Sequence, residues 1–208
     1  MTNGSGLLGD PSSTQSAIIV QQPGSTTLYW IFTVALPGAT AGYSYSIVDM
    51  TMSGGLGAVT ATKNVLIYSP STEKICAIRH CNNVDLWIVT HFFGTNEFRS
   101  YLLTSAGLSA APVSSNVGTA VTTSSQAIGY LHANPNGDKL CAVARYTPAG
   151  SPASIVELFD FNNSTGVVSN ANVIGSGYSH GYGCEFSPNG QYLYTNCDYT
   201  VFQYDLCA

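Results

Sequence analysis

Short apolar runs of four to seven residues alternate along this chain with turns rich in Pro, Asn and Gly. A unit of strand, turn and strand occurs three times, with its turns at residues 21–25, 134–137 and 187–190. Two of these turns contain Asn-Gly, which supplies the positive φ angles that tight hairpins require. No stretch keeps the 3.6-residue period of an amphipathic helix. The pattern therefore predicts an all-β chain built from antiparallel hairpins.

The hairpins repeat with a regular period. A further strand in each unit ends near a fixed position, occupied by Asp49, Leu103, Asp160 and Asp205, with spacings of 54, 57 and 45 residues. Repeats of roughly 40–50 residues with four short strands are typical of β-propeller blades. We expect an irregular lead-in at residues 1–15 and about four consecutive four-stranded blades, at 16–69, 73–125, 126–176 and 181–206.

The predicted fourth blade lacks its outer strand, which favours a fragment of a larger ring whose remaining blades lie elsewhere in the parent chain. The alternative is a closed four-bladed ring, in which residues 1–15 donate the strand missing after Tyr204-Asp205. The phase of the second blade is also open. Residues 69–77 resemble residues 134–142, although the repeat places the two segments on different strands of their blades.

The composition excludes some partners. The net charge is −5 and only 8% of the residues are charged, so the chain lacks the clustered Lys and Arg that bind nucleic acid. No stretch reaches the roughly 18 apolar residues of a membrane helix, and Met1-Thr2-Asn3-Gly4 shows no signal peptide. Its surface must be wetted by hydroxyls and amides, a composition common in secreted β proteins.

Six cysteines and four histidines are scattered along the chain. No Cys-x-x-Cys motif is present, so a zinc ribbon or thioredoxin motif has no support. Cys184 and Cys197 flank the turn at 187–190 and form a disulfide across the hairpin if the register allows, although buried thiols also pack as small hydrophobic groups. We predict no metal site and no cofactor.

Several segments together resemble the propeller region of large Bacteroidetes surface proteins exported by the type IX secretion system. The resemblance rests on residues 6–10, 12–20, 73–75, 80, 87–91, 96–104, 157–166 and 185–190, which are spread over nearly the whole chain. It implies a secreted or surface-displayed, adhesin-like protein of the gliding-motility type. The family's sorting domain and PKD modules are absent from this sequence, and its six cysteines depart from the family pattern.

No catalytic constellation is visible. Asp49, Asp160 and Asp205 recur at one position of the repeat, which indicates a structural role in binding turn backbone. No nucleophile elbow and no phosphate-binding glycine loop occur. We therefore predict no catalytic residues and a protein that is not an enzyme.

The segment between the second and third strands of the second blade is the predicted contact site. Phe92 and Phe93 are adjacent and cannot both face the core of an extended strand, so one of them either lies at the rim or packs between blades. With Asn96 and Glu97 they form a candidate surface for another protein or a surface glycan. The thirteen tyrosines suit sugar stacking and blade packing equally well.

The sequence thus predicts a non-catalytic, extracellular or cell-surface β-propeller module for adhesion, display or recognition. Two alternatives remain: a propeller hydrolase that acts on glycans, and a subunit of an extracellular filament whose open sheet edges are covered by neighbouring chains.

Overall fold

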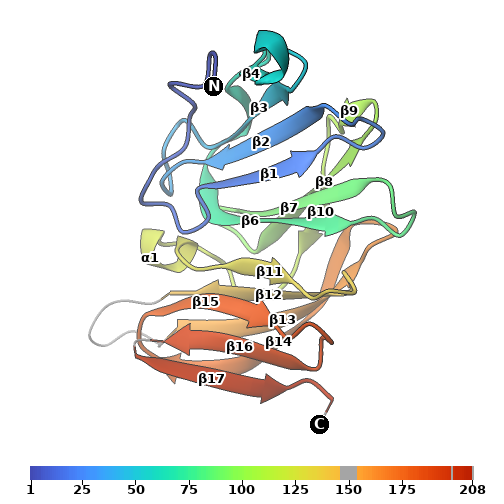
Figure 1. The fold of residues 1–208 in the computed structure, drawn as a ribbon. Coiled ribbons are helices and arrows are strands. Elements are labelled where there is room, and N and C mark those ends of the chain that lie inside the picture. The colour runs from blue at the N-terminus through green and yellow to red at the C-terminus, as the bar shows by residue number, and fades with distance from the viewer. Residues whose placement is uncertain (146–153, 198, 208) are drawn as a thin grey trace.

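Four antiparallel sheets follow one another in chain order in a computed structural model that describes residues 1–145, 154–197 and 199–207 (Figure 1). The third predicted blade, 126–176, therefore includes residues 146–153, which lie outside the described part. The first sheet contains β1 (Ala17–Gln21), β2 (Leu28–Val34), β3 (Tyr43–Asp49), β4 (Ala58–Val59) and β5 (Val65–Tyr68). The second contains β6 (Ser71–Arg79), β7 (Leu86–Phe92), β8 (Glu97–Thr104), β9 (Gly107–Leu108) and β10 (Val113–Asn116). The third contains β11 (Leu131–Ala133), β12 (Lys139–Ala144), β13 (Ser154–Asn162) and β14 (Val167–Tyr178), and the fourth β15 (Gly181–Phe186), β16 (Tyr192–Cys197) and β17 (Thr200–Asp205).

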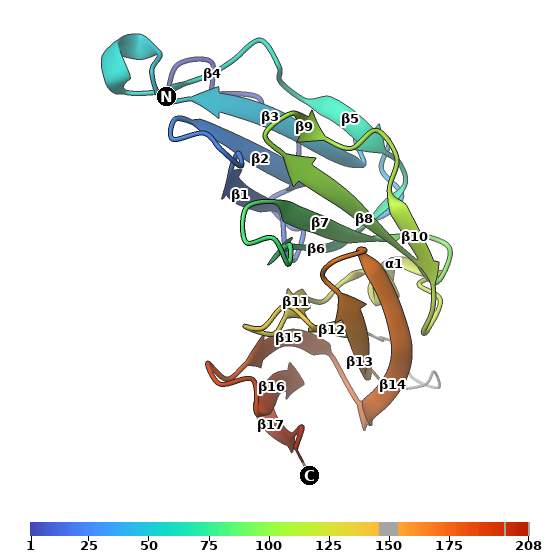
Figure 2. The ribbon, with the colours of Figure 1, turned by 90° about the vertical axis from the view of Figure 1, so that its right-hand side faces the viewer.

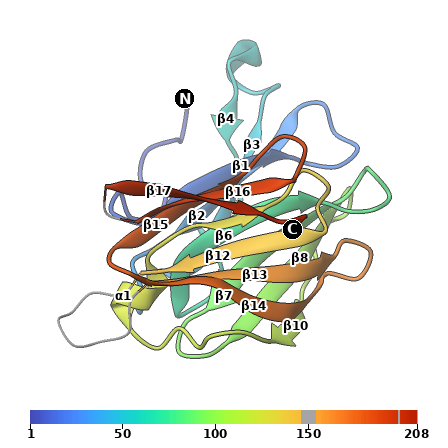
Figure 3. The same ribbon diagram turned by 90° about the horizontal axis from the view of Figure 1, so that it is seen from below.

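The first strands of the sheets gather along one side of the molecule. In Figure 2 the strands β1, β6, β11 and β15 lie toward the left, while the outer strands β5, β10 and β14 lie toward the right. Close contacts link β1 to β6, β6 to β11, and β11 to β15. Seen from below, the sheets overlie one another face to face (Figure 3). We call β1, β6, β11 and β15 the inner strands.

The core consists of three layers, each between two successive sheets. Trp30, Phe32 and Tyr43 of the first sheet pack with Ile75 and Ile88 of the second. A second layer joins the second and third sheets, and a third layer joins the third and fourth. Because the second and third sheets are covered on both faces, their strands read as continuous apolar runs rather than as clean alternation.

The repeat positions predicted from sequence are equivalent in the sheet register. Asp49, Asp160 and Asp205 each lie opposite the first residue of the second strand of their sheet, and Leu103 does the same in the second sheet. The phase of the second sheet is settled in the same way. Residues 71–79 form the inner strand β6, whereas residues 139–144 form β12, the second strand of its sheet. The two similar segments therefore occupy different strand positions in their sheets.

Within the described chain, the lead-in does not complete the fourth sheet. Thr2 forms a parallel bridge with Ala58 of β4, and residues 14–15 bind the second and third sheets. Among the described strands β17 pairs only with β16. The alternative in which residues 1–15 close a four-bladed ring is therefore wrong.

Helix is nearly absent from the described residues. Besides a short 3-10 turn at Ser53–Gly55, α1 (Ser124–Ala127) forms a single turn. The Thr123 hydroxyl accepts a hydrogen bond from the Gln126 backbone and the Gln126 side chain binds back, which is a capping box. No helix in the described part is long and apolar enough to cross a membrane.

Lys74 ties α1 to the second sheet. Its buried ammonium donates to the carbonyl oxygens of Gln126, Ala127 and Ile128 at 3.1, 3.0 and 2.9 Å. These carbonyls end the single helical turn and would otherwise lack donors. The side chain of a lysine is thus part of the interior.

Candidate functional site

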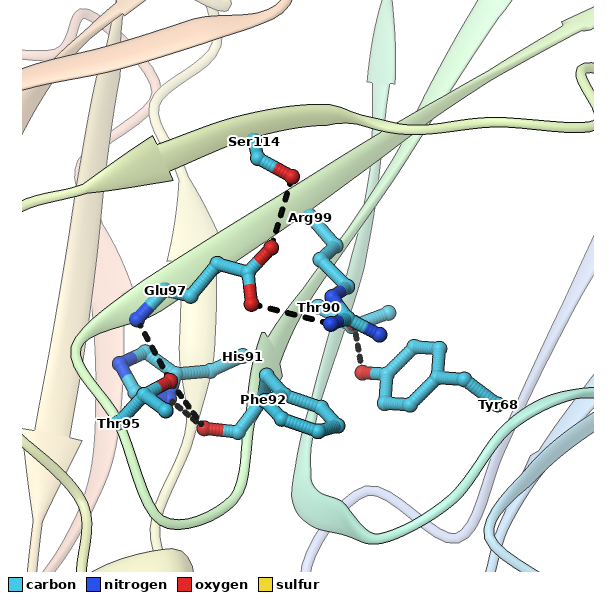
Figure 4. Close-up of polar contacts among 8 residues, drawn as sticks. All are labelled: Tyr68, Thr90, His91, Phe92, Thr95, Glu97, Arg99 and Ser114. Carbon is cyan, nitrogen blue, oxygen red and sulfur yellow. Dashed lines mark hydrogen bonds and ion pairs between the residues drawn. The ribbon is translucent and has the colours of Figure 1, made fainter.

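The predicted contact segment forms the turn between β7 and β8. The Phe92 carbonyl accepts from the Thr95 hydroxyl at 3.3 Å, and that hydroxyl accepts from the Glu97 backbone at 3.0 Å (Figure 4). The Asn96 side chain donates to the Gly118 carbonyl at 3.4 Å. Phe92, Phe93, Asn96 and Glu97 are all half-buried. The turn is therefore held by its own hydrogen bonds and by the segment after β10.

Phe92 contributes to packing between the first and second sheets. Its ring meets Tyr68 of β5 edge to face, with the ring centroids 5.6 Å apart, and the Arg99 guanidinium lies 3.8 Å from the Phe92 ring centroid. Arg99 also lies 4.8 Å from the Tyr68 centroid. Such cation–π contacts gain strength when they are shielded from water. Of the two outcomes expected for the aromatic pair, inter-sheet packing therefore applies to Phe92.

Glu97 fixes the position of Arg99. The two side chains form an ion pair at 3.0 Å, and the other oxygen of Glu97 accepts from the Ser114 hydroxyl at 2.7 Å (Figure 4). The hydrogen bond from Arg99 is the main cause that lowers the pKa of Glu97. Beside this pair, the Tyr68 hydroxyl and the Thr90 hydroxyl are also hydrogen-bonded. This cluster joins β5, β7, β8 and β10.

His91 lies beneath the same turn. Its imidazole is buried, meets the Phe98 ring edge to face at 4.6 Å, and donates from Nδ1 to the Phe92 carbonyl at 3.1 Å. Burial lowers the pKa of His91 to about 3, and the positive charge of Lys74 contributes. His91 is thus neutral near pH 7 and acts as a polar core residue.

The three recurring aspartates do not converge. The Asp49 carboxylate accepts from the Thr51 backbone at 2.8 Å, and Asp205 accepts from the Cys207 backbone at 3.0 Å. Asp160 instead forms an ion pair with Lys139 and accepts from Asn170. Each carboxylate thus binds partners within or next to its own sheet, and the three form no common site.

Cys184 and Cys197 do not form the disulfide expected across the hairpin. Cys184 lies opposite Thr195, and Cys197 lies opposite Gly181, so the two are offset by two residues along β16 and three along β15. Both are buried thiols. The hairpin register itself prevents direct pairing, because it places Cys184 opposite Thr195 and not opposite Cys197. The packing role of a small hydrophobic residue applies instead. The disulfide prediction is wrong in this structure.

A groove of about 830 Å³ runs along the inner strands. This volume lies within the usual range for small-molecule sites, roughly 300–1,000 Å³. Its walls come from the approach to β1 and the start of that strand, from β6 with its turn, and from β11 with its turn. We call it the inner groove. Its lining is mostly polar and includes Gln15, Ala77, Arg79, His80, Tyr130, His132 and Ala133.

The floor of the inner groove is made of strand edges. In an antiparallel pair, residues alternate between those that bond the partner strand and those that point away from it. The Ile75 backbone points away from β7, because its N–H donates to the Gln15 side chain at 3.1 Å. His80 bonds toward β7 through Asp85, which fits the same alternation. Ala77 and Arg79 therefore present their N–H and C=O groups to the groove.

The same alternation applies to the third sheet. The Leu131 N–H donates to the Gln15 side-chain oxygen at 2.9 Å, while the Asn134 N–H bonds to Lys139 within the hairpin. Ala133, two residues after Leu131, thus directs its backbone groups to the groove as well. The small side chains of Ala77 and Ala133 leave these groups accessible.

Gln15 occupies one end of the inner groove. Its oxygen accepts from Ile75 and Leu131, and its nitrogen donates to the Leu131 carbonyl at 3.1 Å. One amide thus satisfies edge groups of two different sheets. Gln15 shows which chemistry the groove floor accepts: a group that donates and accepts at once.

One positive charge and two imidazoles lie along the groove. Arg79 is exposed, and no described carboxylate forms an ion pair with it. The His80 Nδ1 accepts from the Asn82 backbone at 3.0 Å, so its proton lies on Nε2. His132 pairs with Glu185 of β15 at 3.1 Å, beside the groove. Among the described residues, no three metal-binding side chains meet.

Sequence reasoning missed the inner groove. Ala17, Ala77 and Ala133 are separated by about 60 residues each and carry no motif. A usable signal was a small residue in the first strand of each of three successive sheets. Small side chains there leave the backbone groups at the strand edge accessible. The sequence placed its contact site on a turn instead.

No family model matches this sequence, and no curated protein matches it. Solved structures do. A proposed 6-phosphogluconolactonase from Bacteroides fragilis NCTC 9343 aligns with 95% of this chain and 53% of its own, with 15% identity and a TM-score of 0.59. A second proposed 6-phosphogluconolactonase, from Bacteroides uniformis ATCC 8492, aligns with 96% of this chain and 54% of its own, at 13% identity and a TM-score of 0.57. The Dos1 propeller aligns with 86% of this chain and 42% of its own, at 11% identity and a TM-score of 0.51.

These similarities define the class: an all-β chain of antiparallel sheets with a propeller-like arrangement. The chain spans about half the length of the structures it matches. The prediction that the chain is not an enzyme is overturned by the same comparison, because its fold occurs in proteins named as proposed lactonases. Absence of a catalytic motif is no guide in such folds, since their sites assemble from loops and strand ends of several sheets.

Proposed function

We propose that this chain is a ligand-recognition segment of a β-propeller, consisting of four consecutive blades and using the inner groove as its binding site. The observation that carries the proposal is the groove floor, where backbone groups of Ala77, Arg79 and Ala133 face an open polar cavity. Unsatisfied donors and acceptors at a strand edge favour a partner that supplies both.

The test is a thermal-shift screen of the chain against a library of sugars and polar metabolites, followed by amide NMR. A ligand of the inner groove shifts the amide resonances of Ala77, Arg79 and Ala133. The amide resonance of Tyr29, which lies in β2 and does not line the groove, stays unchanged. Ligands that shift only the Phe92–Glu97 turn place recognition there instead and contradict the proposal.

The remaining blades of a longer ring are the proposed neighbours of the fourth sheet. The outer face of this sheet exposes Tyr182, Tyr194 and Val201, the last with 70% of its surface accessible. A further blade packed on this face would bury these side chains as the other three layers are buried. The mass of the native polypeptide tests this, because a native chain of 208 residues that is monomeric would leave the face bare.

An extracellular or cell-surface location remains part of the proposal. The support is the resemblance to type IX-exported surface propellers and the low content of charged residues, 8%. Cell fractionation is the test. Recovery of the native protein from the cytosol would remove the adhesin-like role, while the inner groove would stand as a binding site.

One observation favours a second function, hydrolysis of a sugar-derived ester or lactone. The His132 Nε2 lies 3.1 Å from the Glu185 carboxylate beside the groove, so the pair can accept a proton from a water molecule. That water would attack the carbonyl carbon and the ester C–O bond would break, giving an acid and an alcohol. Turnover of δ-gluconolactone that is lost in both His132→Ala and Glu185→Gln, with folding retained, would establish it.

A further inference from the structure

We infer that the inner groove binds a small anionic carbohydrate, with Arg79 as the anchor for its negative group. The inference rests on the proposed function, because it names the ligand class of the same groove. Its first support is charge. The chain carries a net charge of −5, yet the groove lining contains Arg79, His80 and His132 and no Asp or Glu. Arg79 is the permanent positive charge of this lining, and a cation without a carboxylate beside it in the lining attracts anions.

The second support is the geometry at Arg79. This residue closes β6 and precedes the turn at His80, so its side chain and its backbone N–H belong to the same end of the groove. The inward-facing Arg79 N–H and the His80 imidazole, with its proton on Nε2, add further donors to the residues that line this end of the groove. Several donors around one position suit a carboxylate or a phosphate, since charge-assisted hydrogen bonds are the strong ones.

The remaining groove surface fits hydroxyl groups. Ala77 and Ala133 each present an N–H and a C=O, and a hydroxyl both donates and accepts. Gln15 already pairs with the same edges through an amide that combines a donor and an acceptor. Tyr130 lines the groove as well, and its ring offers an apolar face to a sugar ring.

The exposed edge is too short for an extended peptide. On β6 only Ala77–Arg79 is available, because Gln15 occupies the edge at Ile75 and the chain turns at His80. Strands usually pair over about five or six residues. A compact ligand is therefore favoured over a peptide that adds a strand.

Isothermal titration calorimetry of the 208-residue chain tests the inference with three probes: D-glucuronate, D-glucose 6-phosphate and D-glucose. We expect at least one anionic sugar to bind about tenfold or more tightly than glucose, with affinity that falls as salt rises. The carboxylate and phosphate arms show which anion the groove prefers. Glucose that binds as tightly as both anions would overturn the inference, although the groove would remain a sugar site.

Arg79→Gln is the first variant. It removes the charge but keeps a polar side chain, and we expect anionic-sugar affinity to fall roughly tenfold or more, as loss of a charge-assisted hydrogen bond implies. Lys139→Gln is the matched control, because it changes the net charge equally outside the groove. Equal losses in the two variants would show a general charge effect and contradict the role of Arg79.

Ala77→Glu and Ala77→Gln form a second matched pair. Both side chains enter the groove with the same volume, but only Glu adds a negative charge. We expect Ala77→Glu to bind the anionic sugar about tenfold more weakly than Ala77→Gln. Equal binding by the two variants would refute an anionic ligand.

The failure of this inference can be told apart from the failure of the proposed function. If none of the probes binds but a peptide or a neutral metabolite shifts the Ala77 amide resonance, this inference fails while the proposed function holds. If nothing shifts that resonance, both fail.

Discussion

His91 offers a quantitative test of how the interior beneath the β7–β8 turn is organised. Its imidazole is 2% exposed, packs against Phe98 and donates to the Phe92 carbonyl. Burial lowers its pKa to about 3, from an ordinary value of 6.5. The folded state therefore keeps the ring neutral over a pH range in which the unfolded chain binds a proton.

The direction and size of the effect follow from linkage. Because the unfolded state binds more protons between pH 6.5 and 3, stability is lost as the pH falls through this window. One pH unit corresponds to about 1.4 kcal/mol for a single group. From pH 6.5 to 4.5 the loss due to His91 is thus roughly 2–3 kcal/mol. The hydrogen bond from Arg99 lowers the pKa of Glu97 and so favours its ionised form. Lys74, whose pKa burial lowers to about 7, is mostly protonated throughout.

The perturbation is His91→Asn, whose amide can still donate to the Phe92 carbonyl but does not titrate. Urea unfolding of both proteins at pH 6.5, 5.5 and 4.5 gives the free energy of unfolding. The variant carries a constant penalty for its smaller side chain, but the difference between the two proteins should shrink by roughly 2–3 kcal/mol toward pH 4.5. A difference that stays constant over this range would refute a neutral, buried His91.

Two further predictions concern the backbone between the second and third sheets. Gln15→Ala removes three hydrogen bonds and should lower the free energy of unfolding by about 1–3 kcal/mol in urea titrations. The control Gln21→Ala removes one local bond and should lower it by less than about 1 kcal/mol. Equal losses in the two variants would contradict the role of Gln15 as a bridge between the sheets. Gly129→Ala places a Cβ 2.3 Å from the Val143 carbonyl oxygen at φ +110°, and should cost more than about 2 kcal/mol or prevent folding. Gly38→Ala, at φ +77° with nothing within 4 Å, is the control and should cost about 1 kcal/mol in thermal unfolding; similar melting temperatures for the two variants would refute the close approach.

Errors of the sequence interpretation have specific physical causes. The disulfide failed because the hairpin pairs Cys184 with Thr195, two residues before Cys197. Two cysteines that flank a turn face each other only if the register of the hairpin places them in opposite positions. For Phe92 the sequence left a rim position and packing between blades open, because two adjacent aromatics cannot both face the core of an extended strand. The partners that cover Phe92, Tyr68 and Arg99, come from other strands. The exclusion of enzymes failed because it rested on the absence of local motifs.

The sequence by itself determined the features that depend on neighbours along the chain. Turns of the Asn-Gly type, short apolar runs and a repeating strand end specified an all-β chain, its hairpins and the equivalent positions of Asp49, Leu103, Asp160 and Asp205. Hairpin pairing is local, so its signals lie within a few residues of one another. Only the tertiary structure decided the inner groove. Its floor consists of backbone groups of Ala77, Arg79 and Ala133, and the direction of a backbone N–H depends on which strand pairs on the other side rather than on residue type.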